Sequence, residues 1–417
     1  METSVQPLKM TEKSIGFVLN YWQEVKQSRE AGKLVAWCTT LSPFELLTSM
    51  GITTVFPEGY GAICAVEGVS TELCQRADAL GYSSDLCSVI RNFIGAIDGT
   101  EEEEKEKLPF GGLPKPDVLI CVTYCPGLYK KFKRYSEIYN VPLIVMERPR
   151  IHDSLSKEQI EGLVKEGTQE VKDIIPILEK LTGNKFSYDK LSECMAIESK
   201  VAGLWHDCLG LCKHTPSPMT TMDAFDNVFP FYMYRCSPQA VTYYEEMKKE
   251  LEERVANNIG SLVTDEKYRL YWDIASIPHK NPEISKKFIQ YGAVPVVGMF
   301  PYYFGYDRID PKKPIESMVE TIYFHKSNLG VSTRVEDLLK QIQGFSLDGL
   351  ILQKHRTCQV QMLGSGDLME ALVEKTGLPA VEVEGDPCDG RFYSSADFNS
   401  KMDGFMEILT QRGQTRW

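Results

Sequence analysis

Three of the twelve cysteines in this 417-residue chain stand at positions that suit one shared chemical site. Cys125 lies two residues beyond an apolar run that ends at Thr123. Cys358 follows a second apolar run, which ends at Gln353, and Cys87 follows a polar loop and opens an expected helix. Open α/β sheets bind ligands beyond the carboxyl ends of their strands, and a helix N-terminus there lowers the pKa of a thiol. We therefore expect the fold to gather these thiols as ligands of an anionic metal cluster.

The composition excludes several other classes of function. A formal net charge of −12 argues against binding to nucleic acid, because a phosphate backbone requires a basic surface. The apolar runs are shorter than the roughly 20 residues that span a bilayer, and the N-terminus lacks the apolar core of a secretory signal. We predict a cytoplasmic protein with no nucleic-acid and no membrane partner. In that reducing compartment the cysteines are expected to be packing residues, metal ligands or reactive thiols rather than disulfides.

The elements that position these residues alternate between strands and helices. Strands are expected at 34–38, 53–56, 118–123, 142–146, 268–274, 294–299, 349–353 and 380–384. Helices are expected at 11–29, 43–50, 66–79, 88–97, 128–138, 238–258, 282–291, 314–326, 333–342, 365–376 and 395–410. This alternation predicts an α/β fold with two doubly wound parallel sheets, either Rossmann-like or flavodoxin-like.

The length of the chain exceeds what one hydrophobic core usually holds, which predicts more than one domain. We predict an N-terminal α/β domain with a leading helix at 1–155, a helical insert at 156–235 and a C-terminal α/β domain at 236–417. The acidic run at 101–107 is expected to be a solvated loop, because adjacent like charges repel. The candidate site is expected in the cleft between the two α/β domains.

Four stretches of the sequence, taken together, are similar to a known family. They are SPFELLTSMGITTVFPEGYGAICA, GYSSDLCSVIRNFIG, PDVLICVTYCPGLYKKFKRY and HRTCQVQMLGSGDLMEALVEKTGLPAVEVEGDPCDGR. They resemble the cluster-bearing component of the 2-hydroxyacyl-CoA dehydratase and benzoyl-CoA reductase family, from about residue 34 to the C-terminus. The resemblance implies that Cys87, Cys125 and Cys358 bind a low-potential 4Fe–4S cluster. It also implies that a separate ATP-hydrolysing activator supplies the electrons, and the chain itself contains no G-x-x-x-x-G-K-[ST] sequence.

Additional cysteines close to these motifs depart from the pattern of three ligands. They are Cys64 in GAICA, Cys121 four residues before Cys125, and Cys388 in GDPCDGR. The surplus looks like the double-cubane branch of the same family, in which one homodimeric chain carries an 8Fe–9S cluster. On that resemblance the three would supply some or all of a second ligand set. The alternative is that they are buried structural thiols, above all Cys121, which lies within an expected strand.

Two polar residues near the motifs are candidates for proton chemistry. Glu58 follows Pro57 at the end of an expected strand and could act as an acid or base near the cluster. His355 lies just before Cys358 and could donate a proton or a hydrogen bond to a cluster sulfur. The alternative for both is that they are loop residues with satisfied hydrogen bonds.

A zinc site is the competing metal hypothesis, because two histidines and two cysteines fall within residues 206–214. Cys208 and Cys212 would share one helical face, but the two histidines are poorly placed to complete a tetrahedron. We therefore expect ordinary helix packing there.

The resemblance predicts an oxygen-sensitive, anaerobic reductase component that acts on a small-molecule substrate. The surplus cysteines favour a homodimeric double-cubane enzyme. One alternative is a 2-hydroxyacyl-CoA dehydratase or aryl-CoA reductase subunit with a single 4Fe–4S cluster. The other is a noncatalytic electron-transfer protein.

Overall fold

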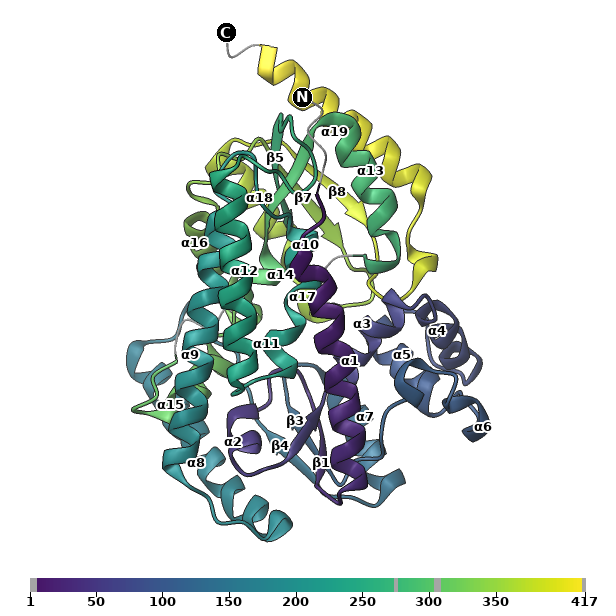
Figure 1. The fold of residues 1–417 in the computed structure, drawn as a ribbon, viewed down its shortest axis with the longest axis vertical. Coiled ribbons are helices and arrows are strands. Elements are labelled where there is room, and N and C mark those ends of the chain that lie inside the picture. The colour runs from purple at the N-terminus through teal and green to yellow at the C-terminus, as the bar shows by residue number, and fades with distance from the viewer. Residues whose placement is uncertain (1–5, 274–276, 304–308, 415–417) are drawn as a thin grey trace.

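Two four-stranded parallel sheets form the framework of the protein. The computed structural model describes residues 6–273, 277–303 and 309–414. The first sheet has the order β2-β1-β3-β4 and contains β1 (Val35–Cys38), β2 (Thr53–Val55), β3 (Val118–Val122) and β4 (Leu143–Met146). The second has the order β6-β5-β7-β8 and contains β5 (Tyr268–Asp273), β6 (Ala293–Gly298), β7 (Gly349–Lys354) and β8 (Ala380–Glu384). The two sheets therefore share one topology, and the predicted α/β class is confirmed (Figure 1).

Helices from the first part of the chain pack around the first sheet. They are α1 (Lys9–Glu30), α2 (Phe44–Ser49), α3 (Pro57–Val66), α4 (Ser70–Ala79), α5 (Ser88–Ile97), α6 (Glu102–Lys105) and α7 (Pro126–Tyr139). Neighbouring strand residues point to opposite faces, as the period of two requires. Ile120 belongs to the apolar cluster that contains α2, whereas Leu119 and Cys121 belong to the cluster that contains α7. Both faces of the sheet are therefore buried.

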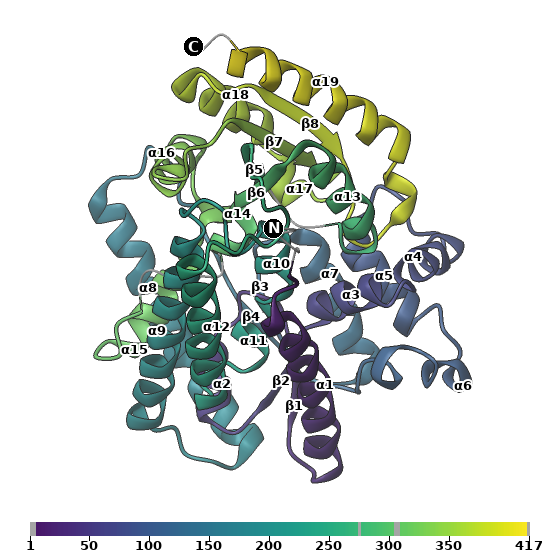
Figure 2. The same cartoon turned by 45° about the horizontal axis from the view of Figure 1, so that its top comes forward.

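A helical stretch separates the strands of the two sheets. It consists of α8 (Lys157–Thr182), α9 (Tyr188–Leu211), α10 (Thr221–Asp226), α11 (Phe229–Met233) and α12 (Pro238–Ala256). Ser156 begins α8 with a capping box, in which its hydroxyl accepts the N–H of Gln159. The long helices α9 and α12 lie side by side in both views (Figure 1, Figure 2). None of the described helices is long and apolar enough to cross a membrane.

The second sheet is covered mainly by helices from the last part of the chain. They are α13 (Asn281–Tyr291), α14 (Met299–Tyr303), α15 (Pro314–Tyr323), α16 (Val331–Ile342), α17 (Gln359–Met362), α18 (Ser365–Thr376) and α19 (Ser395–Gln414). Helix α15 is an exception, because Met318 and Ile322 pack with Ile120 of the first sheet. Helix α15 also lies against α8. The second half of the chain thus reaches across to the first sheet.

Some expected elements differ from the structure. The helix expected at 66–79 is present as α4, but it begins at Ser70, and the preceding helix α3 was not expected. Gly68 has φ of +77°, which a continuing right-handed helix does not allow. The acidic run at 101–107 contains the short helix α6, although most of its side chains are exposed as expected. The last residue of the strand expected at 268–274, Ile274, lies outside the described residues.

Candidate functional site

The three cysteines singled out from the sequence occupy equivalent local positions. Cys87, Cys125 and Cys358 are the N-cap residues of α5, α7 and α17. The carbonyl of each cysteine accepts the first hydrogen bond of its helix, from Arg91 at 2.9 Å, Tyr129 at 3.1 Å and Met362 at 3.1 Å, respectively. All three side chains line one cavity of about 210 Å³. Three separate helix N-termini therefore present their thiols to a common volume.

Local sequence explains why these turns form. The N–H of Thr123 still donates to Met146 at 3.0 Å, so β3 keeps its direction until the turn that leads to Cys125. Pro126 then occupies the first helical position, where its fixed φ favours the start of α7 and its missing N–H costs nothing. In the other sheet, the N–H of Cys358 donates to the backbone carbonyl of His355 at 2.9 Å and closes a tight turn after β7.

Burial raises the pKa of all three thiols. Burial raises the pKa of Cys358 to about 11 and the pKa of Cys87 well above its usual value, and at both residues the charges of neighbouring cysteine sulfurs add to the effect of burial. At Cys125 burial also dominates, but the backbone N–H groups of Leu128 and Gly127 oppose the rise. Metal binding requires thiolates and releases their protons. The site is therefore expected to bind metal more weakly as the pH falls.

Three thiols around one cavity are a donor set of the kind that an iron–sulfur cluster uses. Across the part of the chain that the structure describes, no group of three His, Cys, Asp or Glu side chains is placed to hold one ion. A cubane binds each thiolate through a different iron, so its ligands surround a volume rather than converge on a point. Thiols from three elements around one cavity match that requirement.

The surplus cysteines divide into two groups. Cys388 lines the same cavity as the first three, is fully buried, and its thiol donates to the carbonyl of Gly61 at 3.5 Å. Cys64 on α3 and Cys121 in β3 are also fully buried, but they lie in the apolar core and outside the lining of the cavity. The structure thus brings four of the six candidate ligands to one cavity.

Glu58 also lines this cavity, as the sequence predicted for a residue at the end of a strand. One carboxylate oxygen accepts the N–H of Thr40 at 2.8 Å, and the other accepts the hydroxyl of Tyr124. Burial raises the pKa of Glu58 above its usual value, although both hydrogen bonds oppose the rise. The carboxyl group of Glu58, which lines the same cavity as the three thiols, therefore ionises less readily than an exposed glutamate.

The shared topology, the cysteines and the cavity allow a comparison with known proteins. A family model for the 2-hydroxyglutaryl-CoA dehydratase D-component matches residues 39–409. The chain belongs to this family. The family predicted from the four sequence stretches is therefore confirmed.

The relatives of this D-component chain are enzyme subunits. The (R)-phenyllactyl-CoA dehydratase alpha subunit of Clostridium sporogenes is 24% identical over 391 residues, covering 93% of this chain and 92% of the relative. The alpha subunit of lactoyl-CoA dehydratase from Anaerotignum propionicum is 26% identical and covers 93% of both chains. A benzoyl-CoA reductase subunit of Thauera aromatica is 26% identical and covers 88% of this chain and 87% of the relative. The chain is thus a component of a dehydratase-type or reductase-type enzyme.

His355 lines the same cavity as the three thiols, and its side chain also contacts two buried polar residues. Its Nε2 atom lies 3.2 Å from Asp386 and 3.3 Å from the hydroxyl of Thr357. Sequence reasoning missed both partners, although each lies within two residues of a candidate cysteine. The only signal in the sequence was that both residues are polar and lie beside Cys358 and Cys388. That signal identifies them as partners of His355 only when the fold is known, because the fold places residues 355–358 next to residues 386–389.

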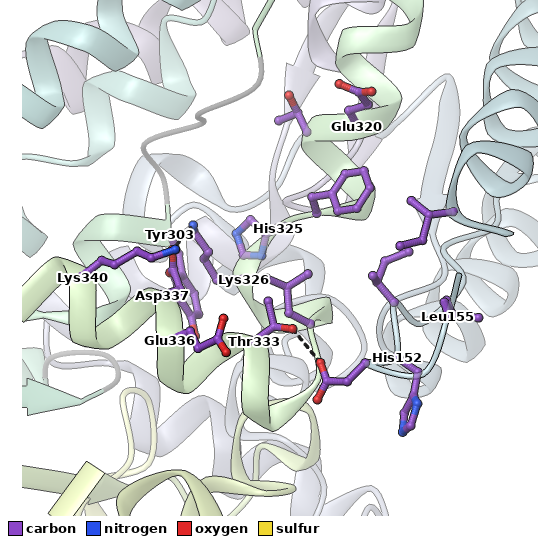
Figure 3. Close-up of a pocket in the computed structure, with 16 residues that line it drawn as sticks. His152, Leu155, Tyr303, Glu320, His325, Lys326, Thr333, Glu336, Asp337 and Lys340 are labelled. Atoms are coloured by element: carbon purple, nitrogen blue, oxygen red, sulfur yellow. Dashed lines mark hydrogen bonds and ion pairs between the residues drawn. The ribbon is translucent and has the colours of Figure 1, made fainter. Parts of the chain in front are cut away.

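A second and larger cavity has a volume of about 630 Å³. Figure 3 draws the residues that line it. Two residues, Tyr303 and His325, line both cavities. Acidic and basic side chains line the larger one, and Lys326 and Asp337 form an ion pair of 2.8 Å there. Burial lowers the pKa of His325 well below its usual value, and the charge of Arg148 adds to the effect. A neutral imidazole therefore stands in the wall that the two cavities share.

Cys208 and Cys212, at the C-terminal end of α9, are buried in the apolar core. The thiol of Cys212 points to the carbonyl of Cys208 at 3.9 Å. This contact is ordinary packing within one helix turn, as the sequence predicted.

Proposed function

We propose that the chain is the iron–sulfur subunit of an activator-dependent dehydratase or reductase, with Cys87, Cys125 and Cys358 as the cluster ligands. The observation that carries the proposal is the meeting of three N-cap thiols around one cavity in a chain of the D-component family. A cluster bound there would supply electrons one at a time at low potential. With three protein ligands, a cubane leaves one iron for a small molecule.

The remaining walls of the cavity support this use. Phe225, Phe229 and Tyr232 line it from α10 and α11, and Phe300 lines it from α14. Apolar and aromatic walls keep water away from the reacting atoms and strengthen electrostatic interactions inside the site. Glu58 supplies a carboxyl group with a raised pKa at the same volume, which suits a reaction that adds or removes a proton.

The electron donor is proposed to be a separate ATP-hydrolysing activator. The chain has no phosphate-binding loop of the G-x-x-x-x-G-K-[ST] type, so this mode of ATP binding would lie on a partner.

Among the finer possibilities, we favour a 2-hydroxyacyl-CoA dehydratase type with a single 4Fe–4S cluster. Three thiols complete the protein ligand set of such a cluster, and relatives covering most of this chain are named for phenyllactyl-CoA and lactoyl-CoA. The larger cavity shares Tyr303 and His325 with the thiol cavity and offers a polar approach for a substrate whose reacting end must reach the thiols.

The second candidate is a homodimeric reductase with an 8Fe–9S double cubane. It is favoured by Cys388, whose thiol reaches the same cavity as the first three. Cys64 and Cys121 would have to leave the apolar core to join it, which adds a conformational requirement that the first candidate lacks.

Iron and sulfide analysis of the anaerobically purified chain tests both candidates. A single cubane gives about 4 iron atoms per chain, and a double cubane gives about 8. A well-folded anaerobic preparation without iron would refute the proposed function. Turnover of a 2-hydroxyacyl-CoA by the chain with its activator, ATP and a strong reductant separates catalysis from simple electron transfer, and electron uptake without any product would favour the relay alternative.

A further inference from the structure

A buried carboxylate, Asp386, lies at the centre of the loops that carry the cysteines. It follows β8 and has no exposed surface. Its Oδ2 atom accepts the hydroxyl of Thr357 at 2.8 Å, and its Oδ1 atom accepts the N–H groups of Cys388 and Asp389, both at 2.9 Å. His355 completes the set at 3.2 Å. One carboxylate thus holds the chain beside Cys358 and beside Cys388.

Thr357 extends this connection to the remaining half of the site. Its Oγ1 atom accepts the N–H of Ser88 at 3.0 Å, and Ser88 directly follows Cys87. Two consecutive hydrogen bonds, from Ser88 to Thr357 and from Thr357 to Asp386, therefore join the first turn of α5 to the turn before α17 and to the loop after β8. Asp386 is thereby linked, through Thr357, to the residue that follows Cys87 and to the residue that precedes Cys358.

The surroundings of Asp386 differ from those of its neighbour Asp389. Asp389 is paired with two guanidinium groups, Arg91 at 2.8 Å and Arg391 at 2.6 Å. Asp386 is met by a hydroxyl, two backbone N–H groups and one imidazole. Hydrogen-bond donors that meet both oxygens of a buried carboxylate favour its ionised form. The negative charge is therefore retained in a buried position beside the cavity.

We propose that Asp386 is a positioning residue with a second, electrostatic effect: it fixes the separation of Cys87 and Cys358, and its charge lowers the reduction potential of the cluster that they hold. This inference rests on the proposed function. A buried negative charge near a cluster disfavours the added electron, because hydrogen bonding, charge and solvent exposure around the sulfurs set the potential. The hydrogen bonds of Asp386 thus fix the separation of the two cysteines, and its charge lowers the reduction potential of the cluster.

Asp386→Asn separates the two effects from each other. The amide keeps the shape and an oxygen that can accept the N–H groups, so the cluster is expected to load, but its midpoint potential in an anaerobic redox titration should become more positive. Asp98→Asn is the matched control, since Asp98 caps the opposite end of α5, roughly 15 Å from Cys87 by helix rise. It makes the same change of charge and should leave the potential unchanged.

Thr357→Val tests the positioning effect without a change of charge. The variant loses the hydroxyl that joins Ser88 to Asp386, so its cluster should be released to a strong iron chelator faster than that of the unmodified chain. Removal of a supporting partner typically lowers metal affinity by about 10-fold to 100-fold. The potential of the loaded Thr357→Val protein should stay close to that of the unmodified protein.

The outcomes distinguish this inference from the proposed function. An unmodified chain without a cluster refutes the proposed function and, with it, the basis of the inference. A loaded Asp386→Asn protein with an unchanged potential overturns the electrostatic effect. If Asp386→Asn does not load, the chelator measurement on Thr357→Val decides: faster release supports positioning by the Asp386 network, and release at the unmodified rate overturns it.

Discussion

The two halves of the molecule place a cysteine at the same point of the same topology. β3 and β7 hold equivalent positions in the two sheets, and each is followed by a short turn and an N-cap cysteine, Cys125 or Cys358. Cys87 instead comes from α5, within the helices that join β2 to β3. The corresponding connection between β6 and β7 contains α15, which packs on the first sheet. The topology shared by the two halves thus positions Cys125 and Cys358. The third thiol, Cys87, comes from a region that only the first half contains.

The two halves also contribute carboxyl groups of opposite character. Glu58, from the first half, has a pKa raised by burial, which favours its protonated form. Asp386, from the second half, is buried as well, but its donors hold its pKa below the usual value and keep it charged. The number and kind of donors, rather than burial, therefore decides which carboxyl group is acid and which is anion.

The equivalence of β3 and β7 predicts that Cys125→Ala and Cys358→Ala have equal and large effects. Each removes one of three cluster ligands, so iron incorporation should fall by more than the roughly 10-fold to 100-fold typical of losing a supporting partner. Cys87→Ala should do the same. Iron and sulfide content after anaerobic reconstitution measures the effect.

Cys208→Ala is the control for these variants, because Cys208 is also a free cysteine but is fully buried in the helical stretch, away from the cavity. Its iron content should match the unmodified chain. A preparation in which Cys208→Ala lost iron while Cys358→Ala retained it would show that the site has been assigned to the wrong thiols.

The equivalence of the two strand ends could be predicted from the sequence, whereas the region that completes the site could not. Apolar runs bounded by glycines or polar turns locate strands and helices well, and the limits of β8 and α18 agree with those expected. The hydrogen bond from Ser88 to Thr357 joins residues 269 positions apart. Such a contact depends on how the two sheets pack together, so no local sequence pattern predicts it. The crossing of α15 to the first sheet was missed for the same reason.

Glu58→Gln and His355→Gln test whether the first half supplies the proton. Glu58→Gln should lower the turnover rate by roughly 10²-fold to 10⁴-fold, the usual contribution of a general acid or base, with iron content unchanged. His355→Gln should lower it less, because His355 is engaged with Asp386. Steady-state rates with the activator in excess measure both. A larger loss for His355→Gln would assign the proton to the second half.

The raised pKa of Glu58 gives this variant a signature in stability. A buried acid that stays protonated in the folded chain but ionises in the unfolded chain costs stability as the pH rises above the unfolded pKa of about 4.3. Unmodified protein should therefore lose stability relative to Glu58→Gln as the pH rises from that value towards the raised folded pKa. Chemical denaturation at several pH values measures the difference, and parallel curves would contradict a raised pKa.

Gly95→Ala tests the packing that holds the region particular to the first half. A Cβ atom at Gly95 would lie 2.0 Å from the carbonyl oxygen of Leu73, so α5 must move away from α4. Overpacking of this kind costs about 1–3 kcal/mol. Because α5 carries Cys87, cluster retention should fall with stability. Gly203→Ala in α9 is the control: its Cβ meets nothing within 4 Å, and the change should stabilise the helix by about 0.5–1 kcal/mol.

The smallest expected effect tests how far the two strand ends are equivalent. Pro126 begins α7, whereas Gln359 begins α17, and both preceding cysteines already have the extended backbone that a following proline requires. Pro126→Ala should lower stability by about 0.4–1 kcal/mol, and Gln359→Pro should raise it by a similar amount, because proline restricts the unfolded chain. Thermal unfolding of the two anaerobic variants measures both changes. If Gln359→Pro destabilised the chain or displaced the cluster, the turn after β7 would need a freedom that the turn after β3 does not, and the equivalence would extend only to the positions of the thiols.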